Sequence, residues 1–452
     1  MYSLVLFFIV PFVMYVLYRM TTNPIWGVVL IFLVQPFESF FPELGGWTVG
    51  RIIGALTTII WLIYLAGHSK SQNQLFKSDL LKKISLFLLF ATTSGLSWLS
   101  AENGKNAIVG AVTFILLGML ALMLENLIHE RKSLVMITTA MALASALACI
   151  PALLYITGVD LYSMVGTQAP TDLNEETMRA PTLGGGNPNS LGIIARNGIF
   201  AAILLVTATQ SKLRKMLGWS FLFFCLSGLV LSGSRTNFYG TIIIVMVMVG
   251  FGAFRIFKNK SQIFVTIIGF LVIAIGAFQF APEPVKARLL MGGEDERIAA
   301  RTTARISVTE EQQLQAWKFV KEYPLFGVGL DRTATEAGPQ GAHDTVSAIL
   351  GETGILGTLS FIILVLWAMF RLWKLLRASN SPKFKLSASL LLGMLVAFII
   401  MGVRGGLIIP YDRTFWLVLG LILPIKRIFT PSLSIKRNDD QAQGTLALQK
   451  SA

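Results

Sequence analysis

One histidine is the residue of this sequence best suited to acid–base chemistry. The chain contains three histidines, His68, His129 and His343. The first two fall in short basic linkers, whereas His343 lies between a long polar segment and an apolar one. A neutral imidazole, with a pKa of about 6.5, can accept a proton from a hydroxyl group. His343 is therefore a candidate general base, and the alternative is an interfacial histidine that only bonds a loop carbonyl.

Arginines stand at unusual positions inside or beside the apolar segments. Arg235 lies in the short turn Ser232-Gly-Ser-Arg235, and Arg196 lies within an apolar segment, where ionisable groups are costly and usually line a polar cavity. A guanidinium group keeps its proton and binds phosphate oxygens in a bidentate way. Several such groups in one pocket would hold a diphosphate without a metal ion, and snorkelling to lipid headgroups is the alternative. The other arginines considered are Arg179, Arg301, Arg305, Arg404 and Arg413.

Three further patterns do not predict a site. Residues 184–189 (GGGNPN) lack the lysine and the strand context of a phosphate-binding loop, so a turn and helix cap is the favoured interpretation. The acidic residues 294–296 lack regular ligand spacing, so no metal or cofactor is expected. Cys149 and Cys225 both lie in apolar segments, which gives no sign of a disulfide framework.

The elements that position these residues are apolar segments. Of the 452 residues, 54% are hydrophobic and 14% are charged, against roughly 25% charged in a soluble domain. Many apolar segments are long enough to cross a hydrocarbon core of about 30 Å as a helix. The sequence therefore predicts an all-α membrane bundle of about 12–14 transmembrane helices. The expected spans are 3–18 (a retained span), 25–37, 52–66, 84–100, 107–124, 134–156, 191–209, 216–232, 237–254, 263–281, 346–370, 386–408 and 414–425.

Charge in the linkers predicts the topology. Basic residues gather in alternate linkers, which are therefore placed on the cytoplasmic side, at 68–83, 125–133, 210–215, 255–262 and 371–385. The net charge of +14 has this origin and does not indicate nucleic acid binding. The long linkers 157–190 and 282–345 fall outside. The expected organisation is 1–156 as N-terminal spans, 157–425 as a catalytic membrane region and 426–452 as a cytoplasmic, disordered tail.

The second long outer linker contains a predicted amphipathic helix. Residues 305–323 are rich in helix-forming types, and Leu314, Trp317 and Val320 recur at three-residue steps. The pattern predicts a helix that lies on the membrane or on the spanning bundle. Pro324 ends it, and a glycine-containing loop follows.

Four segments of the chain resemble motifs of one bacterial family. They are 179–189 (RAPTLGGGNPN), 232–235 (SGSR), 316–329 (AWKFVKEYPLFGVG) and 342–357 (AHDTVSAILGETGILG). In these places and in this order the chain resembles the O-antigen ligase and Wzy-type polymerase superfamily, which are membrane glycosyltransferases with a GT-C-like helical fold.

The resemblance implies an enzyme that moves a glycan from a polyprenyl (undecaprenyl) diphosphate carrier to a sugar hydroxyl, without metal or cofactor. It implies that His343 activates the acceptor and that Arg235 binds the diphosphate and stabilises its developing charge. Arg305 is the expected second catalytic arginine, although it lies further ahead of Trp317 than the family pattern has it. The family more often has Asn where this chain has Asp344. Expected substrate-binding residues are Arg179, Arg196, Arg301, Arg404, Asn189 and Asp344.

Three functions remain open at this level. The first is a Wzy-type polysaccharide polymerase, and the second is a ligase that hands the finished glycan to lipid A core or another acceptor. The third is a transporter or flippase, whose polar residues would line a path near the midplane. The resemblance places the protein in the bacterial cytoplasmic membrane, with its active site on the outer face. Expected partners are the carrier-linked donor, a glycan or lipid-linked acceptor, membrane lipids, and other polysaccharide-assembly and chain-length proteins.

Overall fold

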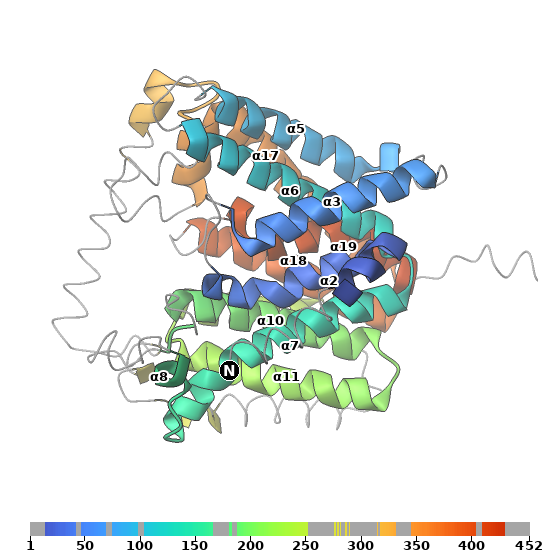
Figure 1. The fold of residues 1–452 in the computed structure, drawn as a ribbon, viewed down its shortest axis with the longest axis vertical. Helices are drawn as coiled ribbons and strands as arrows, with labels where there is room; N and C mark the ends of the chain where they lie inside the picture. The colour runs from blue at the N-terminus through green and yellow to red at the C-terminus, as the bar shows by residue number, and fades with distance from the viewer. Residues whose placement is uncertain are drawn as a thin grey trace, which may run out of the picture.

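A computed structural model shows the arrangement of the predicted helices. It describes residues 14–41, 47–68, 75–97, 104–165, 180–182, 188–251, 317–330, 345–403 and 409–429, with a few isolated positions between 275 and 314. Within these residues every regular element is a helix, so the all-α prediction is confirmed (Figure 1). The elements are α2 (Ile25–Val34), η1 (Gln35–Phe40), α3 (Val49–Gly67), α5 (Asp79–Leu96), α6 (Gly104–Leu127), α7 (Arg131–Ile156), α8 (Leu161–Val165), α10 (Pro188–Ala208), α11 (Lys212–Leu231), α12 (Arg235–Gly250), α17 (Thr345–Ala378), α18 (Pro382–Val403), η3 (Ile409–Tyr411) and α19 (Arg413–Phe429).

The helices are those of a protein that crosses a membrane several times. Among the described residues, 7 helices are long and apolar enough to span a bilayer, namely α3, α6, α7, α10, α11, α17 and α18. The helices α2 and α12 are apolar but shorter. The predicted spans 3–18 and 263–281 lie largely outside the described residues, and each of the other predicted spans overlaps one α-helix, the span 25–37 also reaching into η1.

Helices α10 and α18 form the interior of the bundle. Helix α10 packs against α7 and α11, while α18 packs against α12, α17 and α19. On α7 the residues Ala140, Ala144, Ala148 and Ala152 are all buried, and their four-residue spacing makes a ridge of small side chains. Such ridges let neighbouring helices approach closely, which is how helices gain packing energy in lipid.

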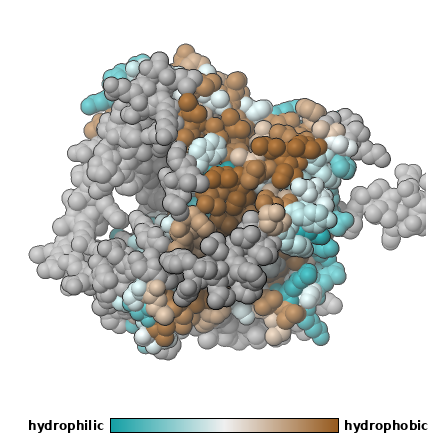
Figure 2. Space-filling view, in the orientation of Figure 1, coloured by the Kyte–Doolittle hydropathy of each residue, from teal (hydrophilic) through white to brown (hydrophobic). Residues whose placement is uncertain are grey.

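Other helices present apolar side chains outward. On α17 the side chains of Leu359, Ile363, Leu366 and Phe370 are exposed, and on α3 Ile63 is 68% exposed. Figure 2 shows hydrophobic side chains across the middle of the bundle and hydrophilic ones toward one end. A water-soluble protein rarely exposes so continuous an apolar area, so this surface faces lipid.

The linkers sort to two ends of the bundle. The basic end carries the connections from α3 to α5, α6 to α7 and α10 to α11, together with the last turn of α19 (right in Figure 1). There the Nη1 atom of Arg427 lies 3.2 Å from Nδ1 of His129. The loop end carries α8, the turn from α11 to α12, and the first residues of α17 and α19. The predicted alternation of linkers therefore agrees with the arrangement of the described helices.

Helix α17 is broken near the loop end. Gly354 has φ 64° and ψ −166°, so residues 345–353 form a short first helix and residues 355–378 form the span. A strap of residues 324–329 pairs with the break through Val328 N to Gly351 O, Gly329 N to Glu352 O, Ile355 N to Pro324 O and Leu356 N to Leu325 O. A Cβ atom on Gly354 would lie 2.5 Å from the carbonyl oxygen of Leu325, which leaves room only for glycine.

Candidate functional site

The turn between α11 and α12 brings a cation to the start of a helix. Gly233 has φ 55°, a left-handed conformation that glycine adopts without strain. The Ser234 amide donates to Ser232 Oγ at 3.2 Å, and Ser234 occupies the N-cap position of α12 without a side-chain hydrogen bond to the helix backbone. Arg235 is the first residue of α12 and is partly exposed. Within the part of the chain that the structure describes, its guanidinium group has no ion-pair, hydrogen-bond or aromatic partner.

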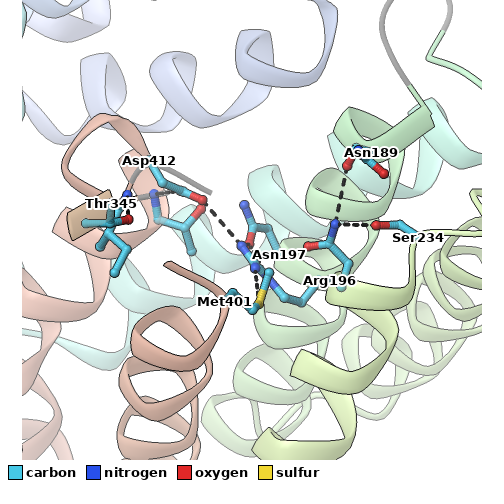
Figure 3. A network of polar contacts seen from close by, with 10 residues as sticks. Asn189, Arg196, Asn197, Ser234, Thr345, Met401 and Asp412 are labelled. Carbon is cyan, nitrogen blue, oxygen red and sulfur yellow. Dashed lines mark hydrogen bonds and ion pairs between the residues drawn. The ribbon is translucent and has the colours of Figure 1, made fainter. Parts of the chain in front are cut away.

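A buried asparagine ties this turn to the start of α10. Asn237 Nδ2 donates to Ser234 Oγ at 2.9 Å and to the carbonyl oxygen of Asn189 at 3.4 Å. The Oδ1 atom of Asn237 is buried and has no hydrogen-bond partner among the residues that the structure describes. Asn189, a predicted substrate-binding residue, thus lies beside the Arg235 turn, and its backbone helps to hold that turn against α10 (Figure 3).

Arg196, the second predicted arginine in the described residues, is enclosed by protein groups. Its side chain is 1% exposed and forms an ion pair with Asp412 at 3.3 Å between Nη2 and Oδ2. Asn197 Oδ1 accepts from Nε at 3.2 Å and from Nη2 at 3.0 Å. Nη1 lies 3.0 Å from Met401 Sδ, and the guanidinium carbon lies 4.9 Å from the Phe398 ring centroid. Arg196 therefore joins α10 to α18 and to the start of α19.

Asp412 is a residue that the sequence reasoning missed. Its Oδ1 atom accepts from the Thr414 amide at 2.7 Å and so caps α19, while Oδ2 accepts from Arg196. Two signals could have found it. Asp412 is the only acidic residue between Glu352 and Asp439, and an aspartate just ahead of an apolar helix is a typical N-cap.

The start of α17 is held by the three-residue turn η3. The Ile409 amide donates to Thr345 Oγ1 at 3.0 Å, and the Tyr411 hydroxyl donates to Glu352 Oε2 at 3.1 Å. The carbonyl oxygen of Glu352 also accepts from Ser94 Oγ on α5. Both ends of the first helix of α17 are therefore fixed in the bundle. His343 and Asp344 come directly before this helix and lie outside the described residues.

The segment ahead of the strap has two faces. Leu314 is 64% exposed and Trp317 is 57% exposed, whereas Val320 is 8% exposed. The predicted apolar stripe is therefore divided: Val320 and its neighbour Phe319 face the bundle, and Leu314 and Trp317 face outward. The following Phe326 ring lies 6.3 Å from that of Phe90 on α5.

The remaining arginines divide into one that is described and several that are not. Arg413, at the start of α19, forms an ion pair with Glu38 of η1 at 2.8 Å. Burial by itself raises the pKa of Glu38, but the hydrogen bond and the charge of Arg413 outweigh it, so this pKa is lowered.

The described residues contain no group of three or more metal-ligating side chains. The predicted residues outside the described part of the chain are Arg179, Arg301, Arg305, His343, Asp344 and Arg404.

The fold is that of a multi-pass, all-α membrane protein, and the groups around Arg196 and Arg235 lie at its loop end. Residues 220–362, about a third of the chain, match a family model described as O-antigen ligase. The matched region begins in α11, contains the Arg235 turn and the strap, and ends in α17. Three of the four segments that carried the resemblance lie inside it, so the resemblance to the O-antigen ligase and Wzy-type superfamily is confirmed. The match supports a membrane enzyme of the O-antigen ligase or polymerase type. Comparison with curated proteins finds no significant match.

Proposed function

We propose that this protein transfers a glycan from a polyprenyl diphosphate carrier to a sugar hydroxyl at the loop end of the bundle. The observation that carries the proposal is that Arg235 has no partner among the described residues. Arg196 and Arg413 both meet carboxylates, whereas no described residue pairs with Arg235. A partly exposed guanidinium group that meets no partner among the described residues is suited to an anionic ligand.

Its position at a helix start adds to this suitability. The first backbone N–H groups of a helix have no partner within the helix and point outward from its N-terminus. The helix dipole favours negative charge at that end. Arg235 is the first residue of the 16-residue helix α12, and the Ser-Gly-Ser turn precedes it. A diphosphate bound here would meet both the guanidinium group and the helix start.

The proposed reaction is a substitution at the anomeric carbon of the donor sugar. The acceptor hydroxyl oxygen forms the new bond to that carbon, and the bond from the carbon to the diphosphate oxygen breaks. The polyprenyl diphosphate leaves with the electron pair, and His343 accepts the hydroxyl proton. Arg235 stabilises the charge that develops on the diphosphate, an effect that commonly contributes most to such catalysis.

Other predicted residues take supporting roles in this proposal. Arg305 supplies a second positive charge to the diphosphate, with Arg301 beside it. Arg179, Arg404 and Asp344 contact the sugars or the carrier. Arginine side chains, rather than a metal ion, neutralise the leaving group. In this proposal, these residues lie together at the outer face of the bacterial cytoplasmic membrane.

Complementation of a deletion strain tests the assignment. His343→Ala should abolish glycan assembly at normal protein abundance. Arg235→Lys should lose most of the activity, because a lysine ammonium does not replace the guanidinium fork. Arg214→Lys, at the exposed basic end, serves as the matched control and should retain activity. Wild-type behaviour of either first variant would contradict its catalytic role.

The deletion strain also separates the candidate functions. We favour the polymerase, and single repeat units should then accumulate on the carrier. Long chains left on the carrier would indicate a ligase. Carrier-linked glycan held on the cytoplasmic leaflet would indicate a flippase instead.

A further inference from the structure

Two contacts on α10 link the proposed anion site to the start of α17. The Asn189 carbonyl oxygen accepts from Asn237 at 3.4 Å, and Arg196 binds Asp412 at 3.3 Å. Asn189 and Arg196 are seven residues apart and therefore lie on one face of the helix, two turns from each other. Figure 3 shows Arg196 between the Asp412 and Thr345 group on one side and the Asn189 and Ser234 group on the other.

The Asp412 side of this link continues to α17 through η3. The Asp412 amide donates to the Ile409 carbonyl oxygen at 3.0 Å, and the Ile409 amide donates to Thr345 Oγ1 at 3.0 Å. Two residues on from Ile409, Tyr411 bonds Glu352. Thr345 and Glu352 are again seven residues apart, so η3 contacts one face of the first helix of α17 at both its ends.

Burial makes the ion pair a rigid part of this chain of contacts. The side chains of Arg196 and Asp412 are 1% and 4% exposed. A buried charge that loses its partner is costly, so the pair strongly disfavours alternative positions of η3. Supporting contacts of this kind determine whether reactive groups meet in a productive geometry.

We propose that Arg196 and Asp412 are positioning residues, which fix the start of α17 relative to the Arg235 turn. The proposal rests on the proposed glycan transfer, in which His343, two residues before Thr345, receives the acceptor proton. Arg196 then acts from within the protein, through Asp412, rather than by touching the substrate. Misplacement of reacting groups by about 1 Å can lower a rate by about a hundredfold.

The test compares variants that alter this link with one that alters a neighbouring ion pair. Asp412→Ser removes the charge but retains an N-cap side chain for α19, because serine caps helices well. Thr345→Val removes the hydroxyl that accepts from Ile409, and Thr345→Ser restores it. Glu38→Gln is the matched control, because it breaks the adjacent ion pair with Arg413 without touching α17.

Steady-state kinetics of the full chain in nanodiscs, with a polyprenyl-diphosphate-linked glycan as donor, give the first measurement. Asp412→Ser and Thr345→Val should lower kcat by about ten- to a hundredfold and leave the KM for the donor near its wild-type value. Thr345→Ser and Glu38→Gln should keep a kcat near that of the wild type. A wild-type kcat in Asp412→Ser, or equal values in the two Thr345 variants, would overturn the proposal.

Amide hydrogen exchange gives a second measurement that needs no activity. In Asp412→Ser the peptide covering residues 345–352 should exchange faster than in the wild type, whereas in Glu38→Gln it should not. If the wild-type protein transfers no glycan, the proposed function fails, and this exchange comparison still decides the positioning role. If Asp412→Ser does not fold, the two Thr345 variants decide it in both measurements.

Discussion

Two arginines of the same bundle end contrast in almost every respect. Arg196 lies within a span, is 1% exposed, and has each guanidinium nitrogen in contact with a protein group. Arg235 begins a helix, is partly exposed, and has no partner among the described residues. The sequence suggests substrate binding for both. An arginine in or beside an apolar segment indicates polar surroundings. Only the contacts of its side chain show whether its partner is a protein group or a ligand.

The largest expected effect concerns the stability that Arg196 provides. Arg196→Met leaves the Asp412 carboxylate buried without its cation, and removing one member of a buried ion pair costs about 3–5 kcal/mol. Chemical unfolding in mixed micelles should show this loss. The double variant Arg196→Met with Asp412→Ser should recover most of it, because no charge remains buried. A single variant as stable as the wild type would mean that Arg196, like Arg235, has no stabilising partner among the described residues.

Arg235→Ala should lower activity strongly and leave stability almost unchanged, in contrast to Arg196→Met. Loss of one group that stabilises developing charge typically lowers a rate by about a hundred- to a thousandfold. Because no described residue depends on Arg235, the free energy of unfolding should change by less than about 0.5 kcal/mol. Glycan transfer and thermal unfolding, measured on the same preparation, check both halves of this prediction. A large loss of stability would show that Arg235 has a structural role like that of Arg196.

Gly233→Ala tests whether the turn, and not only the charge, defines the Arg235 site. A left-handed conformation costs an alanine about 1–2 kcal/mol, and φ at this position is 55°. The turn should relax and shift Arg235, so activity should fall by about tenfold while the guanidinium group remains. Transfer assays at saturating donor measure the change. Unchanged activity would mean that the backbone of the turn has no part in binding.

The smallest effect is expected for the ion pair between Glu38 and Arg413, which is intermediate in exposure. The two side chains are 21% and 16% exposed, so Glu38→Gln should cost at most about 1 kcal/mol. The folded-state pKa of Glu38 is lowered, chiefly because Arg413 outweighs the effect of burial. The stabilisation is therefore present at neutral pH and is lost as the pH falls through that lowered pKa. As the pH falls from neutral through the ordinary range of a glutamate carboxyl and below it, the wild type should lose more stability than the glutamine variant.

The sequence predicted most of the fold because the membrane imposes a simple rule. A helix satisfies its own backbone hydrogen bonds in lipid, so apolar length and basic linkers suffice to place spans and to alternate the two ends. The break in α17 was not predicted in this form. A single continuous apolar segment gives no sign that residues 324–329 pair with the backbone around Gly354, since that pairing joins segments by tertiary contact.

The candidate site was predicted only in part, for the same reason. Residue type and the short Ser-Gly-Ser turn singled out Arg235, because local features can show that a cation lies at a helix start. From the sequence alone, Leu314, Trp317 and Val320 belong to one apolar stripe. That Leu314 and Trp317 are exposed and Val320 is buried depends on which helices pack against this segment.

By itself the sequence determined that this chain is a helical membrane protein, which linkers share a side, and that it resembles a family of glycan-transferring enzymes. These properties follow from local composition, from charge and from short motifs. Only the tertiary structure decided that Asp412 neutralises Arg196, that η3 holds the first helix of α17, and that Arg235 meets no described carboxylate. Partners more than 200 residues apart leave no local pattern, because their contact exists only once the helices have packed.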